Sequence, residues 1–376
     1  MDSIRSLASA AAINNNNPQE GINTMKKIII VLLALVLCVL PVLTACNDDP
    51  KPNPPSTTGT EAPGTTAPVT EPKPDPVTTT EPAAFGDFDY ILTLGYATIV
   101  GYHGNGGDVV IPEKIDGKYP VTEIAKMAFM YQEAITSLTI PGSVKATGEL
   151  AFFHCVGLTK VTLGSGVEKI SRGSFNACEA LAEIVVPASV KTIEDIAFVG
   201  CTALTSFDFT NVTTLGYRAF AASGLTSVVL PAGLTNLGES VFGSCKSLVS
   251  ADIQGVYETF PAGMFGYCYA LKNVKFAEGT KRIGNTVFFR CTGLETVTLP
   301  ASCYKIENQC FYGCTSLNTI NFLCKEKMYI NYYAFYFLPA LTTCNYGGSE
   351  ETFGTWEWDT YNDFLKEATF NFNYAG

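Results

Sequence analysis

Few residues of this chain have the type and spacing that chemistry requires. The 376-residue sequence contains only two histidines, His103 and His154. Neither lies in a pattern that pairs a base with a Ser or Cys nucleophile. The cysteines form no CxxC pair and no cluster with histidine. The sequence therefore predicts no metal site and no cofactor.

The carboxylates Asp208 and Asp252 are the remaining candidates for catalysis. In the repeat that organises the chain, both fall in one outward column, two coils apart. At ~4.8 Å per coil they would stand roughly 10 Å apart, which approaches the spacing of an inverting glycosidase pair. Nothing in the sequence would raise the pKa of one above the other. We therefore predict a non-catalytic protein and keep a glycan-processing enzyme as a remote alternative.

The elements that must position these residues come from a repeat that runs through residues 121–346. Its clearest copy begins at Val167 and ends at Pro187, and its marker is a phenylalanine that returns at steps of 22 to 24 residues. The ten positions are Phe129, Phe152, Phe175, Phe198, Phe220, Phe242, Phe265, Phe288, Phe311 and Phe335. A period of that length indicates a solenoid, in which each unit buries its apolar side chains against its neighbours.

Each repeat combines two extended pieces with a corner. Alternation of Val161 and Leu163 with Lys160 and Thr162 predicts a strand. A second short extended piece follows, and the apolar spacing around each Phe predicts one or two helical turns. The predicted fold is therefore an α/β repeat solenoid of the leucine-rich-repeat type, with ~23-residue repeats. One face carries a parallel β-sheet, the other carries short helices and turns, and both ends are capped.

Thirteen cysteines stand in the chain, and seven follow a repeat phenylalanine by three residues. The seven are Cys155, Cys178, Cys201, Cys245, Cys268, Cys291 and Cys314. Because stacked coils place them in one inner file, we predict free buried thiols that behave as small hydrophobes. Four others break the file, and a disulfide among them stays an open alternative: Cys303, Cys310, Cys324 and Cys344.

The order Leu-x-x-Val-x-Leu, then Val-x-x-Ile, then Ala-Phe-x-x-Cys resembles the leucine-rich repeats of the BspA-like bacterial surface proteins. The resemblance covers residues 121–346, although the fifth and tenth repeats depart from the pattern. It implies a cell-surface adhesion or interaction role, with a protein partner on a host or neighbouring cell. A carbohydrate-binding surface module is the second hypothesis, and the tryptophans Trp356 and Trp358 of the tail are one candidate sugar site.

The first 84 residues differ from the repeat. Residues 1–24 are polar and of low complexity, and residues 25–45 read as a secretory signal with Met25 as a possible true start. The ending Leu43-Thr44-Ala45-Cys46 resembles a bacterial lipobox, which predicts lipid on Cys46 and a membrane anchor; an ordinary signal peptide is the alternative. Residues 46–84 are rich in proline and threonine, which predicts an extended stalk.

Two flanking segments complete the predicted organisation. Residues 85–120 contain two alternating stretches joined through Gly95, which predicts a hairpin that caps the solenoid at its N-terminal end. Residues 347–376 are predicted to form a short helix and a strand that cap the other end. Caps are needed because an open last coil leaves unpaired backbone and apolar surface.

Two surfaces of the predicted solenoid could bind a partner. The first is the polar sheet face, whose outward side chains are rich in Ser, Thr and Asn and suit many weak hydrogen bonds. Its candidate residues are Lys160, Thr162, Glu183, Ser206, Asp208, Ser227, Ser250, Asp252, Asn273, Lys275, Thr296, Thr298, Thr319 and Asn321. The alternative is an aromatic corner after the repeat phenylalanine, for which packing between coils is the preferred interpretation: Tyr267, Phe289, Tyr312, Tyr336 and Phe337.

Charge narrows the class of partner. The net charge is -11, but residues 47–84 and 347–376 each carry six acids against two and one lysines. The repeat itself is therefore close to neutral and has no footprint for nucleic acid. We expect a monomer on the extracellular face of a bacterial membrane, with a protein or glycan as its partner.

Overall fold

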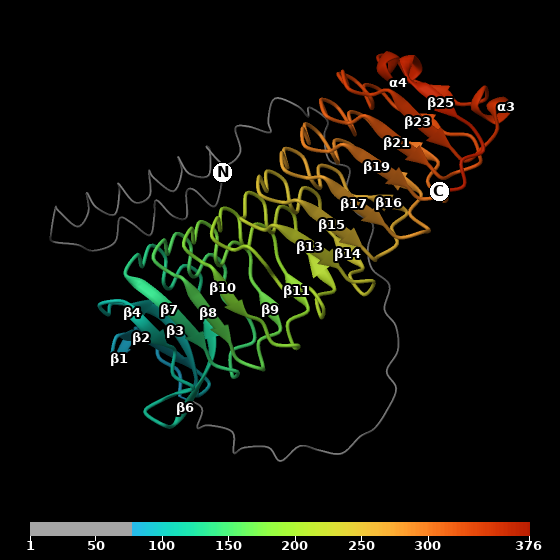
Figure 1. Ribbon diagram of the computed structural model, residues 1–376. Helices are drawn as coiled ribbons and strands as arrows, with labels where there is room; N and C mark the ends of the chain where they lie inside the picture. The colour runs from blue at the N-terminus through green and yellow to red at the C-terminus, as the bar shows by residue number, and fades with distance from the viewer. Residues whose placement is uncertain (1–76) are drawn as a thin grey trace, which may run out of the picture. The chain divides into compact units, whose positions relative to one another are not determined.

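The computed structural model describes residues 77–376, which form a parallel β-solenoid of about twelve coils with ~23-residue spacing (Figure 1). The solenoid and its repeat length are as predicted. The predicted signal peptide, Cys46 and almost all of the stalk lie outside the described residues. Within residues 77–376, no helix is long and apolar enough to cross a membrane.

One strand from each coil except the fifth repeat builds what we call the long-strand face. Its strands are β4 (Gly107–Val110), β7 (Ile135–Ile140), β8 (Lys160–Leu163), β10 (Glu183–Val185), β13 (Ser227–Leu230), β15 (Ser250–Ile253), β17 (Asn273–Phe276), β19 (Thr296–Leu299), β21 (Thr319–Phe322), β23 (Thr343–Tyr346) and β25 (Thr369–Asn371). They pair in three parallel sheets, β4 to β10, β13 to β17 and β19 to β25. Alternation decides their orientation, since Val161 and Leu163 are buried while Lys160 is exposed.

A second set of strands builds the short-strand face and confirms the second extended piece of the repeat. These strands are β9 (Lys169–Ile170), β11 (Thr192–Ile193), β12 (Thr214–Leu215), β14 (Asn236–Leu237), β16 (Thr259–Phe260), β18 (Arg282–Ile283), β20 (Lys305–Ile306), β22 (Tyr329–Ile330) and β24 (Glu357–Trp358). They form two parallel sheets, β9 to β14 and β16 to β24. Each coil therefore hydrogen-bonds to its neighbours on two sides.

The corner that contains the phenylalanine consists of turns, where the sequence predicted short helices. The N–H groups of Leu150, Phe152 and His154 donate to carbonyls of the next coil at 2.8 to 2.9 Å. The intervening Ala151 and Phe153 donate to the carbonyl three residues back. Because alternate N–H groups point along the solenoid axis, a continuous α-helix cannot form. Left-handed backbone at Leu150 (φ 52°) and His154 (φ 58°) produces this alternation.

The repeat phenylalanines stack in one column through the core. All ten are fully buried. Neighbouring rings from Phe129 to Phe335 lie 4.9 to 6.0 Å apart between centroids, with interplanar angles of at most 28°. Each such contact stabilises by about 0.5–1.5 kcal/mol beyond area burial. The column therefore holds every coil to the next one.

The cysteine file lies beside this column, and its thiols form hydrogen bonds between coils. Each of the seven Sγ–H groups donates to the carbonyl oxygen of the phenylalanine one coil earlier, at 3.0 to 3.2 Å. Eleven cysteines are described, and all are buried and free. The prediction of buried free thiols is confirmed, and the described cysteines form no disulfide. Another hydrogen-bond donor can replace the thiol at this position. In the first repeat Gln132 stands there and donates to the Tyr102 carbonyl at 2.8 Å.

The N-terminal segment continues the solenoid by one coil. Strand β3 (Tyr96–Tyr102) pairs in parallel with β6 (Tyr119–Ile124), and Tyr102 stacks on Phe129 at 5.5 Å, so it extends the phenylalanine column. The predicted hairpin is confirmed: β2 (Phe88–Thr93) pairs antiparallel with β3 through Leu94 and Gly95, which both have positive φ. Strands β1 (Ala83–Phe85) and β5 (Lys114–Ile115) complete this sheet.

The C-terminal segment also adds a coil. Strand β24 continues the short-strand face and β25 continues the long-strand face. The short helices α3 (Glu350–Phe353) and α4 (Asp363–Glu367) lie before and between these strands. The buried side chain of Asn362 accepts a hydrogen bond from the Phe335 N–H at 2.9 Å, which ties this coil to the last repeat. Both ends of the described solenoid, residues 77–376, thus reuse the geometry of the repeat (Figure 1).

Candidate functional site

The long-strand face brings most of the predicted polar residues into two aligned columns. One column pairs Ser227 with Ser250 and Ser250 with Asn273. The other places Asp252 between Val229 and Lys275. Towards the N-terminus, Lys160 and Glu183 pair in register and form an ion pair at 2.9 Å. Towards the C-terminus, Thr296 pairs with Thr319 and Thr298 with Asn321. The predicted outward positions therefore share one surface.

The fifth repeat interrupts these columns. Ser206 and Asp208 are exposed but lie in a segment without a strand, so they do not continue the ladder from β10 to β13. The neighbouring Phe207 and Phe209 pack against Phe220 at 4.9 and 5.2 Å. Phe207 and Phe209 stand at the two inward positions that Val161 and Leu163 hold in β8. The expectation that Asp208 and Asp252 belong to one continuous strand column is therefore wrong.

The surroundings of Asp208 also disfavour acid catalysis. Its carboxylate accepts a hydrogen bond from the Thr210 N–H at 2.9 Å. Hydrogen bonds from the Thr210 side chain and backbone lower the pKa of Asp208. A general acid at neutral pH needs the opposite shift. Asp252 accepts a hydrogen bond at 3.2 Å from the side chain of Gln254, the residue that directly follows β15.

A depression lies on the long-strand face where the sheet is interrupted between β17 and β19. Its volume is about 730 Å³, and its walls include Asp252, Asn273, Lys275, Thr296 and Thr298. Strands β17 and β19 do not pair with each other, although coils on both sides remain laddered. Backbone groups at such a break are open to water or to a ligand. We call this depression the sheet groove.

A side-chain ladder that was not predicted from the sequence lies at the C-terminal end of the same face. The amide of Asn345 donates to Asn321, and that of Asn371 donates to Asn345, each at 2.8 Å. Asn321 donates in turn to Thr298 at 3.0 Å. The signal was available as Thr-x-Asn, which recurs at Thr319, Thr343 and Thr369. These amides satisfy each other and leave a regular polar edge beside the sheet groove.

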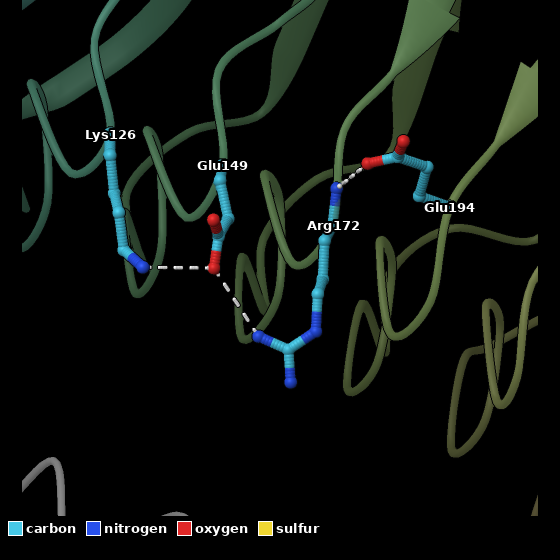
Figure 2. A network of polar contacts seen from close by, with 4 residues as sticks. All are labelled: Lys126, Glu149, Arg172 and Glu194. Carbon is cyan, nitrogen blue, oxygen red and sulfur yellow. Dashed lines mark hydrogen bonds and ion pairs between the residues drawn. The ribbon is translucent and has the colours of Figure 1, made fainter. Parts of the chain in front are cut away.

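The N-terminal coils carry a charged network that the sequence analysis also missed (Figure 2). Glu149 forms ion pairs with Lys126 at 3.0 Å and with Arg172 at 3.4 Å. The Arg172 backbone N–H donates to Glu194 at 2.9 Å. The first three residues each stand three positions before a repeat phenylalanine, so they form one column across successive coils. Because both signs alternate, the network is close to neutral and joins coils without offering a charged binding patch.

The predicted aromatic corner is mainly a packing feature. Phe289 lies 5.3 Å from Tyr267 and 5.0 Å from Tyr312, and Tyr312 lies 5.5 Å from Tyr336. These four side chains are half-buried, whereas Phe337 is 51% exposed. The row continues into tyrosines of the C-terminal coil that were not among the predicted site residues. The corner therefore joins coils and ends in an exposed group of rings.

Neither histidine stands in a catalytic arrangement. His103 lies in the N-terminal coil, 3.7 Å from Asp89 in a pair that is open to solvent. His154 packs against Tyr131 and Phe153 at ring distances of 5.0 and 6.0 Å. No group of three or more His, Cys, Asp or Glu side chains in residues 77–376 is placed to hold a metal ion. The described thiols are buried within the core.

Two sets of parallel strands, a continuous phenylalanine column and a file of seven buried thiols define a leucine-rich-repeat solenoid. Six copies of the BspA-type leucine-rich repeat region match residues 122–249 and 242–360. This match spans more than half of the chain, and the chain belongs to the BspA-type leucine-rich repeat family. The resemblance inferred from the sequence is thereby confirmed.

Several solved structures are similar to this chain. A leucine-rich repeat protein from Bacteroides ovatus is 24% identical, with a TM-score of 0.54, and the match covers 77% of this chain and 78% of that one. A leucine-rich cell surface protein from Faecalibacterium prausnitzii is 23% identical over 75% and 99% of the two chains, with a TM-score of 0.39. The pneumococcal vaccine antigen PcpA is 16% identical over 79% and 98%, also with a TM-score of 0.39. No curated protein matches the chain.

Proposed function

We propose that this protein is a non-catalytic binding module of the bacterial cell surface, which presents its long-strand face to a protein partner. The sheet groove is the observation that carries the proposal. It combines Asp252 and Lys275, which are neighbours in register, with uncharged Asn273 and Thr296 around a space of about 730 Å³. A groove with both charge signs and many neutral donors suits a polar protein surface.

Membership of the BspA-type family supports the binding role, because repeats of this kind supply extended surfaces. The proposed position at the cell surface rests on the lipobox-like Leu43-Thr44-Ala45-Cys46 and on the proline-rich stalk that follows it. Lipid on Cys46 would hold the chain to the membrane, and the stalk would hold the solenoid away from it. Adhesion to a host or neighbouring cell is the role that this arrangement serves.

The test is binding of the purified chain to an array of extracellular-matrix and cell-surface proteins at physiological salt. We expect a saturable protein ligand. Its binding should weaken about tenfold or more in Lys275→Glu, because this substitution places a second acid beside Asp252. The control is Lys191→Glu, because Lys191 is exposed next to β11 on the short-strand face. Equal binding by both variants and the parent chain would remove the sheet groove as the site.

A further inference from the structure

The strongest unassigned surface is an exposed group of tyrosines at the C-terminal end of the aromatic corner. We call Tyr332, Tyr333, Tyr336 and Tyr361 the tyrosine cluster. Tyr333 stacks on Tyr361 with ring centroids 4.4 Å apart and an interplanar angle of 9°. Tyr332 stands perpendicular to both, at 4.4 and 5.3 Å, and Tyr336 stands perpendicular to Tyr333 at 5.1 Å. The last repeat and the added C-terminal coil build the cluster together.

Tyr332 of the cluster stands at a position that carries charged side chains in the N-terminal coils. Three residues before the phenylalanine, the N-terminal coils carry Lys126, Glu149 and Arg172, which form the ion-pair network of Figure 2. The last repeat carries Tyr332 there, and Tyr332 is 42% exposed. An exposed ring is therefore not required for stacking of coils at this position.

Backbone conformation makes the same point for Tyr333. Its φ value is 55°. The equivalent place in other coils has φ between 52° and 65° and carries residues as different as Leu150, Gly173 and Gln309. The turn therefore accepts many side chains and does not itself require a tyrosine.

The open faces and hydroxyls of the cluster fit a sugar ring. Tyr361 is 45% exposed although Tyr333 stacks on one of its faces. A pyranose presents C–H groups on one face and hydroxyls around its edge, which complement a tyrosine face and its neighbouring phenols.

Area and charge favour one kind of occupant. The exposed parts of Tyr332 and Tyr361 offer roughly 200 Å², since a large aromatic side chain has about 150–250 Å² of surface. A stable protein interface needs ~800 Å² on each partner, whereas one or two sugar rings fit the smaller area. The acids of residues 347–376 outnumber the lysines by six to one, so a polyanionic glycan would be repelled.

We infer that the tyrosine cluster is a binding site for an uncharged glycan, whose sugar ring lies against Tyr361 and Tyr332. This site is separate from the sheet groove and does not depend on the proposed protein partner. The two sites occupy different sides of the solenoid, since the groove lies on the long-strand face and the cluster at the corner.

The experiment is native affinity electrophoresis of the purified full chain in gels that contain one neutral polysaccharide each: starch, mixed-linkage β-glucan, mannan, galactan or arabinoxylan. We expect at least one polymer to retard the chain, and Tyr332→Ala and Tyr361→Ala to weaken that binding about tenfold. The matched control is Tyr217→Ala. Tyr217 is 43% exposed and also stands three residues before a repeat phenylalanine.

Several results would overturn the inference. One is no retardation by any of the five polymers, and another is equal retardation of the parent chain and all three variants. Discovery of a protein ligand that depends on Tyr332, with no glycan bound, would also assign the cluster to a different partner. Thermal unfolding followed by circular dichroism identifies a misfolded variant, in which case Tyr332→Ser and Tyr361→Ser take its place. Loss of protein binding in Lys275→Glu would leave the glycan result unchanged.

Discussion

The buried thiols predict that this protein loses its fold in mildly alkaline solution. Burial is the largest cause of a raised pKa at every described cysteine, for example to about 12 for Cys155 and Cys303 and about 11 for Cys245. The unfolded chain releases these protons near the ordinary value of 9.0. Unfolding is therefore coupled to proton release, and the free energy of unfolding falls as pH rises from about 9 towards the folded-state values.

The magnitude follows from the number of thiols. A cysteine that stays protonated when folded and ionises at pH 9.0 when unfolded lowers the free energy of unfolding by about 0.4 kcal/mol at pH 9 and about 1.4 kcal/mol at pH 10. Over the eleven described thiols the loss is about 4–5 kcal/mol at pH 9 and about 15 kcal/mol at pH 10. Domains of ordinary stability have about 5–15 kcal/mol in total. We therefore expect unfolding close to pH 10.

The assay is urea unfolding followed by circular dichroism at several pH values between 7 and 9.5. Cys155→Ser is the informative variant, because a hydroxyl can replace the thiol donor to Phe129 but does not ionise in this range. It should lose about one-eleventh less free energy than the parent chain over the same pH interval. A parent chain with the same free energy of unfolding at pH 7.5 and pH 9.5 would refute the reasoning.

Three further predictions concern other contacts. Phe265→Ala removes a fully buried ring that lies 6.0 and 5.8 Å from its neighbours in the column, and should lower the free energy of unfolding by about 3–5 kcal/mol in urea titrations; a loss below ~1 kcal/mol would contradict the column's role. Glu149→Gln breaks two solvent-exposed ion pairs and should cost at most ~1 kcal/mol at low salt and nothing measurable at 1 M salt, where a persistent loss would argue against a screened interaction. In a bacterial host fed radiolabelled palmitate, label should disappear from Cys46→Ala, and its retention would remove the proposed anchor.

The repeat could be predicted because it requires the same residue types at fixed spacing. The phenylalanine at every 22nd to 24th residue and the cysteine three residues later mark the core, and alternation around Val161 marks a strand. Each of these signals follows from burial of one side of a stacked coil. The outward columns then followed from the period of two along a strand.

What could not be predicted depends on contacts between coils. The corner looked helical because its apolar spacing is tight, but alternate N–H groups such as those of Phe152 and His154 bond to the next coil. The N-terminal coil was hidden because Tyr102 stands where the repeat has phenylalanine. In the fifth repeat, Phe207 and Phe209 fit the apolar pattern of a strand, although the structure has no strand there. The break between β17 and β19 has no marker that we can identify in the sequence.

Because the register between coils is constant, the length of the solenoid can change by whole repeats. Lys169 pairs with Thr192, and Thr192 pairs with Thr214, at the same place in each coil. A deletion from Asn176 to Phe198 would join Phe175 directly to Val199. The phenylalanine column would then continue without a gap and contain one ring fewer. Gain or loss of one 23-residue unit in the gene would thus move the C-terminal tyrosines by one strand spacing, ~4.8 Å. Relatives with different numbers of units would then hold the same end groups at different reach.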